Sequence, residues 1–329
     1  MPGHPGPAFG RPECRLVPGI HVFRLAKKQD VDGRDKPGHD GIDMAIDYDK
    51  LLALKIPDAE HTYGERETML YALGVGLGHD PTDRAQLDFV YEKNLKALPT
   101  FACLLGYPGF WVRDLDTGID WVRIVNGEQG FTLKAPVKPR GTVVGKTRIV
   151  DVIDKGAGKG AVVYTERKIT DTASGEEVAT VTQTTFCRAD GGFGGPPRES
   201  PPLHKTPERA PDIVCDLVTR PEMALVYRLS ADLNPLHADL DVAKAAGYPR
   251  PILHGLGTFG VVGHALLKSV CNYDPSRLTA MGGRFSAPVF PGETIRTEIW
   301  RDGPVVSFRA LVPERNVVAM SNGRAEIEE

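Results

Sequence analysis

The sequence lacks the features that mark membrane-spanning, nucleic-acid-binding and zinc-binding proteins. In its 329 residues no run approaches the roughly 18 consecutive apolar residues that a membrane span needs. Its formal charge of -3 lacks the basic excess of most nucleic-acid-binding domains. The five cysteines are scattered without C-x-x-C spacing, so they give no zinc signal and fit a reducing compartment. We therefore expect a cytoplasmic protein with neither nucleic-acid nor membrane partners.

The first 43 residues differ from the rest of the chain. They are broken by glycine and proline and have no sustained hydrophobic period. They also lack the apolar core, about seven or more residues long, of a signal peptide. From Met44 onward the composition is that of a folded protein. We expect residues 1–43 to be a disordered extension upstream of a true start at Met44, with a disordered native tail as the alternative.

A proline- and glycine-rich segment, residues 191–212, divides the remaining chain. It contains "GGFGGPPRESPP" and has no apolar period, which is typical of an extended crossover between two units. We expect an N-terminal unit over residues 44–190 and a C-terminal unit over residues 213–329.

The two units share faint internal similarity, which predicts a duplicated domain. "LYALGVGLGHD" parallels "VYRLSADLNPLH", which places Tyr71 and Tyr227 at equivalent positions, 156 apart (227 − 71). "APVKPRGTV" parallels "APVFPGETI", which places Ala135 and Ala287 at equivalent positions, 152 apart (287 − 135). Two pairs of matching segments, in the same order and at nearly the same offset, arise by chance less easily than one pair.

Each unit is predicted to contain a short helix, a polar loop, a longer helix and then strands. In the second unit the apolar residues recur every three or four positions from about Leu253 to Val270, which predicts the longer helix. The glycines inside that stretch are costly in a helix and indicate close approach by another element or a ligand. Val-, Thr- and Ile-rich segments such as "GTVVGKTRIVDVI", "GAVVYTERKIT" and "VVSFRALV" predict strands. The expected class is α+β, with mostly antiparallel sheet.

Two neighbouring segments of the second unit carry groups suited to proton transfer. "YRLSADLNPLH" places Asp232 and His237 five residues apart around an Asn-Pro turn at Asn234. "PILHGLG" places His254 and Gly255 at the predicted helix start, where backbone N–H groups can hold an oxyanion. The first unit has no equivalent pair in the same order. Two histidines and an aspartate could also bind a metal, but no HExxH or Cys/His cluster supports this, so we expect no metal.

These segments strongly resemble the hydratase 2 motif of the MaoC-like dehydratases, and the likeness includes "YGERETMLYALGVG", "GGFGG" and "RFSAPVFPGETI". The resemblance implies a double hot-dog fold of two tandem units, each a long helix wrapped by an antiparallel sheet. It implies that the C-terminal unit is catalytic and that the N-terminal unit makes room for the acyl tail. The resemblance assigns catalysis to Asp232, His237, Asn234 and Gly255. The residues that it implies for substrate or CoA binding are Asn126, Gly127, Lys155, His254 and Arg284.

The function that this resemblance implies is reversible hydration of trans-2-enoyl-CoA to (3R)-hydroxyacyl-CoA, as in fatty-acid β-oxidation. The chain would then be a hydro-lyase, with acyl-CoA as its substrate, no separate cofactor and a homodimeric assembly. Two alternatives stay open. One is a hot-dog thioesterase, which would release free CoA, and the other is a non-catalytic subunit that binds acyl-CoA.

Overall fold

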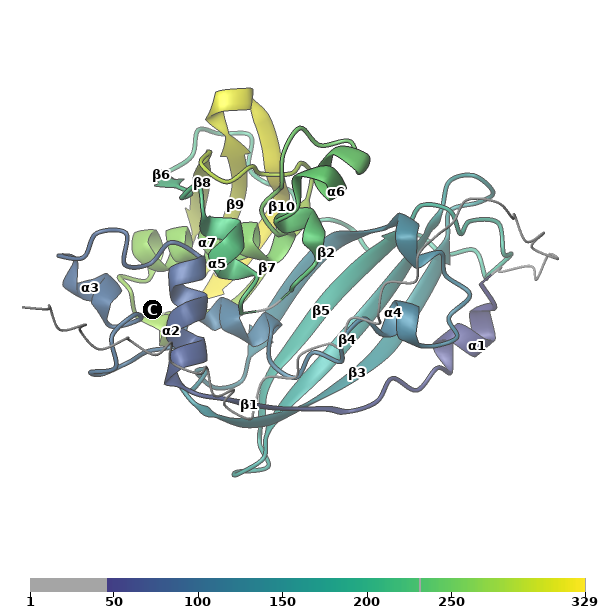
Figure 1. The fold of residues 1–329 in the computed structure, drawn as a ribbon, viewed down its shortest axis with the longest axis horizontal. Coiled ribbons are helices and arrows are strands. Elements are labelled where there is room, and N and C mark those ends of the chain that lie inside the picture. The colour runs from purple at the N-terminus through teal and green to yellow at the C-terminus, as the bar shows by residue number, and fades with distance from the viewer. Residues whose placement is uncertain (1–45, 231, 329) are drawn as a thin grey trace, which may run out of the picture. The chain divides into compact units, whose positions relative to one another are not determined.

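The computed structural model describes residues 46–230 and 232–328, so the expected extension and start site lie outside the described residues. Its ten strands form one antiparallel sheet in the order β1-β3-β4-β5-β2-β7-β10-β9-β8-β6 (Figure 1). The strands are β1 (Ala59–Tyr63), β2 (Ile124–Leu133), β3 (Gly141–Asp154), β4 (Ala161–Asp171), β5 (Glu177–Cys187), β6 (Ile213–Val218), β7 (Leu278–Phe285), β8 (Thr294–Asp302), β9 (Val305–Val312) and β10 (Val317–Ile327).

Helices of different lengths connect and cover these strands. The α-helices are α1 (Tyr48–Leu52), α2 (Glu65–Gly74), α3 (Arg84–Leu87), α4 (Trp111–Asp114), α5 (Met223–Tyr227), α6 (Leu240–Ala245) and α7 (Gly255–Val270). The 3-10 helices are η1 (Pro99–Cys103), η2 (Trp121–Arg123), η3 (Pro235–His237), η4 (Pro275–Arg277) and η5 (Pro313–Arg315). The α+β class is confirmed, and the strands predicted from the Val-, Thr- and Ile-rich segments are present.

The sheet is continuous because a strand of each half meets a strand of the other at its centre. β2 of the first half pairs with β7 of the second, with Glu128 opposite Arg284 and Thr132 opposite Ala280. On either side of this junction the strands follow as a similar series, β5, β4 and β3 on one side and β10, β9 and β8 on the other. The two halves therefore share backbone hydrogen bonds as well as side-chain packing.

The long helix expected in the second half is present as α7, and most of its residues are buried. Its glycines allow close contact with the first half. A Cβ on Gly260 would lie 2.4 Å from Cγ1 of Val75, and one on Gly263 would lie 2.4 Å from Cγ2 of Thr100. The predicted close approach is therefore made by the segments that contain Val75 and Thr100.

The expectation of a long helix in the first half is wrong. The place of α7 in that half is taken by the five-residue 3-10 helix η1, and among the described residues its longest helix is α2, with ten. Pro99 begins η1, and Gly106 and Gly109, both with positive φ, follow it. Proline and left-handed glycine stop a helix from continuing, and Pro108 lies between these two glycines.

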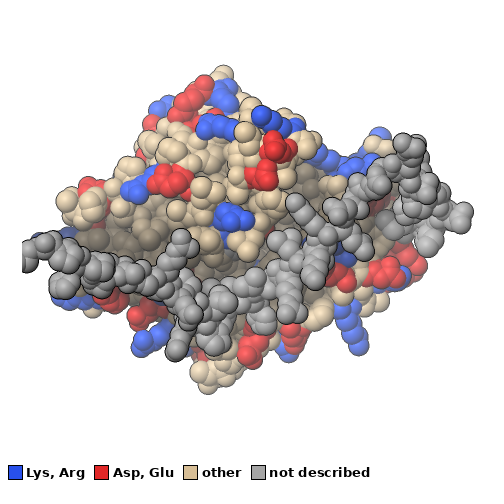
Figure 2. Space-filling model, in the orientation of Figure 1, with Lys and Arg blue, Asp and Glu red and all other residues tan. Residues whose placement is uncertain are grey.

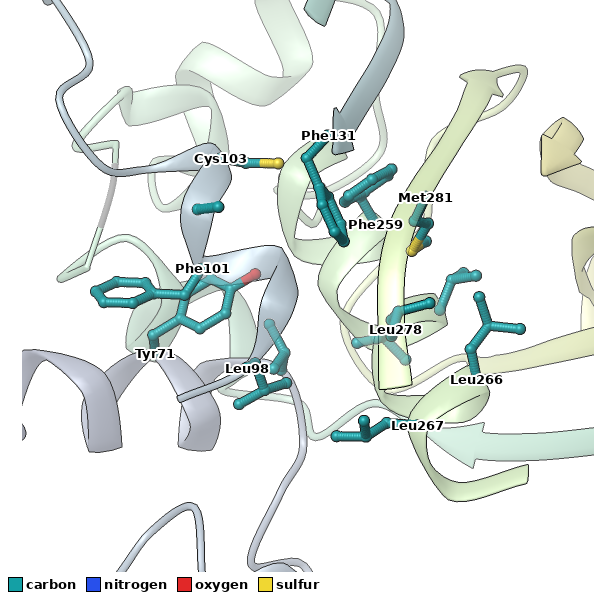
Figure 3. Close-up of a cluster of buried hydrophobic side chains, with 14 of the residues drawn as sticks. Tyr71, Leu98, Phe101, Cys103, Phe131, Phe259, Leu266, Leu267, Leu278 and Met281 are labelled. Atoms are coloured by element: carbon teal, nitrogen blue, oxygen red, sulfur yellow. The ribbon is translucent and has the colours of Figure 1, made fainter. Parts of the chain in front are cut away.

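Equivalent residues of the two halves meet in the core. The rings of Tyr71 and Tyr227 have centroids 6.0 Å apart, and both side chains are buried. Contacts between counterparts are expected about a two-fold axis. Figure 3 shows how one hydrophobic cluster combines side chains of α2, η1, β2, α7 and β7, including Phe101, Phe131 and Phe259.

The described surface carries charges of both signs. On the face shown in Figure 2, Lys and Arg side chains alternate with Asp and Glu side chains over the described part of the chain. None of the helices described here is long and apolar enough to cross a membrane.

Candidate active site

The loop after α5 positions the predicted catalytic pair through two side-chain turns. The carboxylate of Asp232 accepts a hydrogen bond from the backbone N–H of Asn234 at 2.9 Å. The Asn234 side chain in turn accepts one from the N–H of Leu236 at 3.0 Å and so caps η3, the short helix that ends at His237. Asp and Asn side chains stabilise such turns, and Pro235 suits the first position of the helix. Asn234 therefore sets the spacing between the carboxylate and the imidazole.

His237 lies below the surface with one ring nitrogen committed and the other available. Its Nδ1 donates to the carbonyl of Ile252 at 2.8 Å, and the residue is 8% exposed. Since the carbonyl can only accept, the proton of the neutral ring is on Nδ1 and Nε2 carries a lone pair. Burial lowers the pKa of His237, while the Ile252 carbonyl and the Asp232 carboxylate act in the opposite direction. The imidazole is therefore poised to exchange a proton through Nε2.

His254 supports both members of this pair. Its ring stacks on that of His237 with centroids 3.6 Å apart and an interplanar angle of 25°. Its Nε2 donates to the backbone carbonyl of Asp232 at 3.0 Å, and it is only 3% exposed. Burial, with a smaller contribution from His237, lowers the pKa of His254 to about 3, so this ring is neutral near pH 7. This placement points to a supporting role rather than the CoA contact assigned to His254 from the sequence.

The three side chains converge in one small space. One ligand-type atom from each of Asp232, His237 and His254 lies within 4.8 Å of the other two. A metal would require lone pairs aimed at a common point. Each ring instead already uses one nitrogen as a donor to a backbone carbonyl, His237 to Ile252 and His254 to Asp232. The arrangement suits proton exchange between a carboxylate and an imidazole.

The start of α7 supplies the electrophilic group next to this pair. Gly255 is the first residue of the helix, and the first intrahelical bond runs from Thr258 N–H to the His254 carbonyl at 2.9 Å. The N–H groups of the first helical turn have no partner inside the helix and carry partial positive charge. A Cβ on Gly255 would lie 3.5 Å from the Phe285 ring, an ordinary contact. The N–H of Gly255 can therefore face a thioester oxygen.

Three of the residues assigned to CoA lie along the β2–β7 junction. Asn126 accepts a hydrogen bond from Nε2 of Gln183 at 2.8 Å, and Gly127 sits in a bulge of the β2–β5 ladder. Arg284 donates from Nε and Nη2 to Glu128 at 3.0 and 2.7 Å. The Arg284 side chain is 43% exposed, so part of it faces solvent despite this ion pair.

Lys155 lies apart from the residues described so far. It follows β3 directly, and its Nζ donates to Ser200 in the segment between the halves at 2.5 Å. No contact among the described residues joins it to the catalytic pair. Its role in CoA binding stays a prediction.

Two residues near the site were missed from the sequence. Arg228 donates from Nη2 to the Leu233 carbonyl at 3.0 Å and so braces the catalytic loop. Arg167 is buried on the inner face of β4, where strand alternation places it in one row with Val163, Thr165 and Ile169. That alternation was visible in "GAVVYTERKIT" and could have identified a charged side chain pointing into the protein.

Comparison with known proteins identifies the family. A model of the MFE-2 hydratase 2 N-terminal domain matches residues 61–189, and a MaoC like domain matches residues 202–322. The peroxisomal enoyl-CoA hydratase 2 of Arabidopsis thaliana is 37% identical over 300 residues, which is 85% of this chain and 95% of that protein. The 3-hydroxyacyl-thioester dehydratase Y of Mycobacterium tuberculosis is 39% identical over 266 residues, 79% of this chain and 89% of that protein.

A solved structure agrees with these sequence matches. The crystal structure of a MaoC-like dehydratase from Phytophthora capsici superposes with a TM-score of 0.76 at 34% identity, over 85% of this chain and 98% of that one. The chain belongs to the hydratase 2 branch of the MaoC-like dehydratases. The double hot-dog fold expected from the sequence is thereby confirmed, with the shortened first helix as its departure.

Proposed function

We propose that this protein reversibly hydrates trans-2-enoyl-CoA thioesters to (3R)-hydroxyacyl-CoA, with Asp232 and His237 as its acid–base pair. The observation that carries the proposal is their convergence, to within 4.8 Å, beside the N-terminus of α7. The names of its relatives, enoyl-CoA hydratase 2 and 3-hydroxyacyl-thioester dehydratase, support a hydro-lyase that acts on such thioesters. The stereochemistry follows the family.

The chemistry needs two proton transfers on one face of the substrate. Water loses a proton as its oxygen attacks C3, and C2 gains a proton as the enolate collapses. Asp232 and His237 can carry out both transfers as one coupled unit, since each is within reach of the other. Negative charge gathers on the thioester oxygen in between, where the N–H of Gly255 stabilises it. CoA is part of the substrate, and these steps use only side chains and backbone of this chain.

The test is hydration of crotonyl-CoA and longer trans-2-enoyl-CoA thioesters. The loss of the conjugated enoyl absorbance measures the reaction. Asp232→Asn and His237→Gln should each lower kcat by roughly 100- to 10,000-fold while the circular dichroism spectrum is unchanged. The double variant should be no worse than the poorer single one, because the pair acts as a unit. Full activity in both single variants would defeat the proposal.

The two alternatives have separate signatures in the same assay. A thioesterase would release free CoA, which a thiol reagent detects. A non-catalytic subunit would bind acyl-CoA, seen by calorimetry, and leave the enoyl absorbance constant. Either result in the unmodified protein would replace the hydratase proposal.

Assembly and location are further parts of the proposal. We expect a homodimer, so light scattering should give twice the mass of the chain. We also expect a cytoplasmic location, although the Arabidopsis relative is named as peroxisomal. Fractionation of the source cells would distinguish the two.

A further inference from the structure

A recess lined by both polar and apolar side chains lies on the inner face of the first half. It is small and partly open to solvent, and its lining includes Tyr107, Thr147, Thr165, Arg167 and Gln183 and also the apolar Trp111. These come from β3, β4, β5 and the segment after η1. The first half has only the five-residue η1 where the second half has the sixteen-residue α7.

Arg167 is the most unusual group in this recess. It is 5% exposed, and its Nη2 donates to the carbonyl of Cys103 at 2.5 Å. Its Cζ lies 5.3 Å from the centroid of the Tyr107 ring. Its Nε is buried without a partner, and no Asp or Glu pairs with the guanidinium among residues 46–230 and 232–328.

A buried cation without a counter-ion is costly, and the protein has few ways to avoid that cost here. Burial lowers the pKa of Arg167, but a guanidinium stays protonated in proteins. Buried charges in proteins are otherwise paired or hydrogen-bonded. The carbonyl of Cys103 and the face of Tyr107 satisfy only part of this charge. The remaining donor therefore points to an anionic group that comes from a ligand.

Other polar groups extend the site across three strands. Thr147 lies opposite Arg167 in the β3–β4 ladder, and Thr165 lies opposite Gln183 in the β4–β5 ladder. The hydroxyl of Thr147 is buried and has no partner within the described part of the chain. An unbranched hydrocarbon tail would leave this hydroxyl and Nε of Arg167 unsatisfied. A carboxylate could accept hydrogen bonds from both.

The recess is linked by a hydrogen bond to one of the residues predicted to bind CoA. Gln183, one of its lining side chains, donates to Asn126 at the bulge of β2. Desolvation raises the pKa of Tyr107, the cation of Arg167 opposes this, and the carboxylate of Asp232 adds to it. The Tyr107 ring lies against Arg167, and its 46% exposure places it at the open side of the recess.

We infer that this recess binds the far end of an acyl chain that carries a terminal carboxylate, with Arg167 as the counter-ion. The inference rests on the proposed function, because it names the substrate class of the same site. The recess is small and partly open to solvent, so it suits only the end of the chain. The preferred substrates are then enoyl thioesters of dicarboxylic acids.

The experiment compares matched substrates. Trans-2-hexenoyl-, octenoyl- and decenoyl-CoA are each assayed beside a counterpart whose terminal methyl group is replaced by a carboxylate. For at least one length, the unmodified protein should show a kcat/KM for the carboxylate roughly tenfold or more above that for the methyl substrate. Arg167→Met should lower kcat/KM for that carboxylate by roughly 10- to 100-fold and change the methyl substrate less than about threefold.

Lys168→Met is the matched control. Lys168 is the next residue of β4, its side chain is 55% exposed, and it lies 3.7 Å from Glu177. The Lys168→Met substitution removes one positive charge from the opposite face of β4. Both kinds of substrate should therefore keep their wild-type kinetics. Equal losses for the two substrates in Arg167→Met would mean that the recess serves CoA or the fold, and would overturn the inference.

A measurement on the unmodified protein covers the case in which Arg167→Met does not fold. Saturated acyl-CoA thioesters of the same lengths, with and without the terminal carboxylate, should bind with Kd values that differ by roughly tenfold or more in favour of the carboxylate. Equal affinities at every length would overturn the inference. Absence of hydration for all substrates would instead defeat the proposed function, and the binding comparison would still decide the recess.

Discussion

His254 stacks on His237 with ring centroids 3.6 Å apart and at the same time holds the backbone of Asp232 through its Nε2. One buried ring thus fixes the two groups that the proposed reaction requires. His254 lies 17 positions beyond His237 in the sequence (254 − 237), and only the fold brings the two rings together.

This geometry predicts that His254 acts on kcat. His254→Phe keeps a flat ring but loses the donor to Asp232, and His254→Gln keeps a donor but loses the stacked ring. Each should lower kcat by roughly 10- to 100-fold through misplacement of the pair, with KM for the enoyl-CoA nearly unchanged. Because His254 is neutral near pH 7, neither variant should move the pH profile of kcat/KM near neutrality. A profile displaced by a full unit would assign His254 a direct part in proton transfer.

The start of α7 allows the oxyanion donor to be removed without disturbing the helix. Proline is tolerated at the first helical residue, and His254 before it has φ −55° and ψ 142°, which a following proline accepts. Gly255→Pro should therefore fold normally and lower kcat by roughly 100- to 1,000-fold, because its N–H is lost.

Gly255→Ala is the companion variant. It keeps the N–H, and its Cβ would make only ordinary contact with Phe285. Any loss of kcat in Gly255→Ala results from crowding at the substrate. The difference in kcat between Gly255→Pro and Gly255→Ala therefore measures the contribution of the hydrogen bond. If both lose activity equally, the N–H of Gly255 is not the donor.

Buried histidine should make the protein sensitive to acid. Burial lowers the pKa of His264 to about 4, against about 6.5 in an unfolded chain. Between these values the unfolded state binds a proton that the folded state excludes, so the free energy of unfolding falls as pH drops below about 6.5. The loss from this residue should reach about 2 kcal/mol at pH 5, at 1.36 kcal/mol per pH unit.

Urea denaturation of the unmodified protein and His264→Gln at pH 7 and pH 5 would measure this loss. The variant should lose less stability between the two pH values, by about the amount assigned to His264. Curves that shift in parallel would show that other groups govern acid unfolding.

The contact of Gly145 with Gly106 predicts a large effect on stability. A Cβ on Gly145 would lie 2.0 Å from the carbonyl oxygen of Gly106, so β3 and the segment before Tyr107 would have to separate. Gly145→Ala should lower the free energy of unfolding by about 3 kcal/mol and weaken acyl-CoA binding. On the same strand, Gly141→Ala meets nothing nearer than 3.8 Å and should be close to neutral. Similar denaturation midpoints for the two variants would contradict this packing.

Much of the fold could be predicted because alternation and helical period are local signals. The segments around Val143, Val163 and Val306 all became strands, and the apolar stripe from Leu256 to Val270 became α7. The absence of a long helix from the first half was predictable in principle, since Pro99 and Gly106 lie in the segment where that helix was expected. The error came from extending the likeness between the halves beyond the residues that carry it.

The candidate site was predicted unevenly for a physical reason. Asp232, Asn234 and His237 are close in sequence and tied by local turns, so their spacing already implied their proximity. The stacking of His254 and the isolation of Arg167 depend on segments that only tertiary packing brings near. Their partners could not be derived from spacing alone.

The ladder between β2 and β7 determines how the two halves would behave if the chain were cut between them. Separated at the segment between the halves, each fragment would present a bare central strand as an edge, with Gly130 and Gly282 no longer covered. Such fragments should be insoluble alone and recover one folded body when expressed together. Carrying both halves on one chain thus guarantees, at any concentration, an encounter that two free chains would have to achieve by collision.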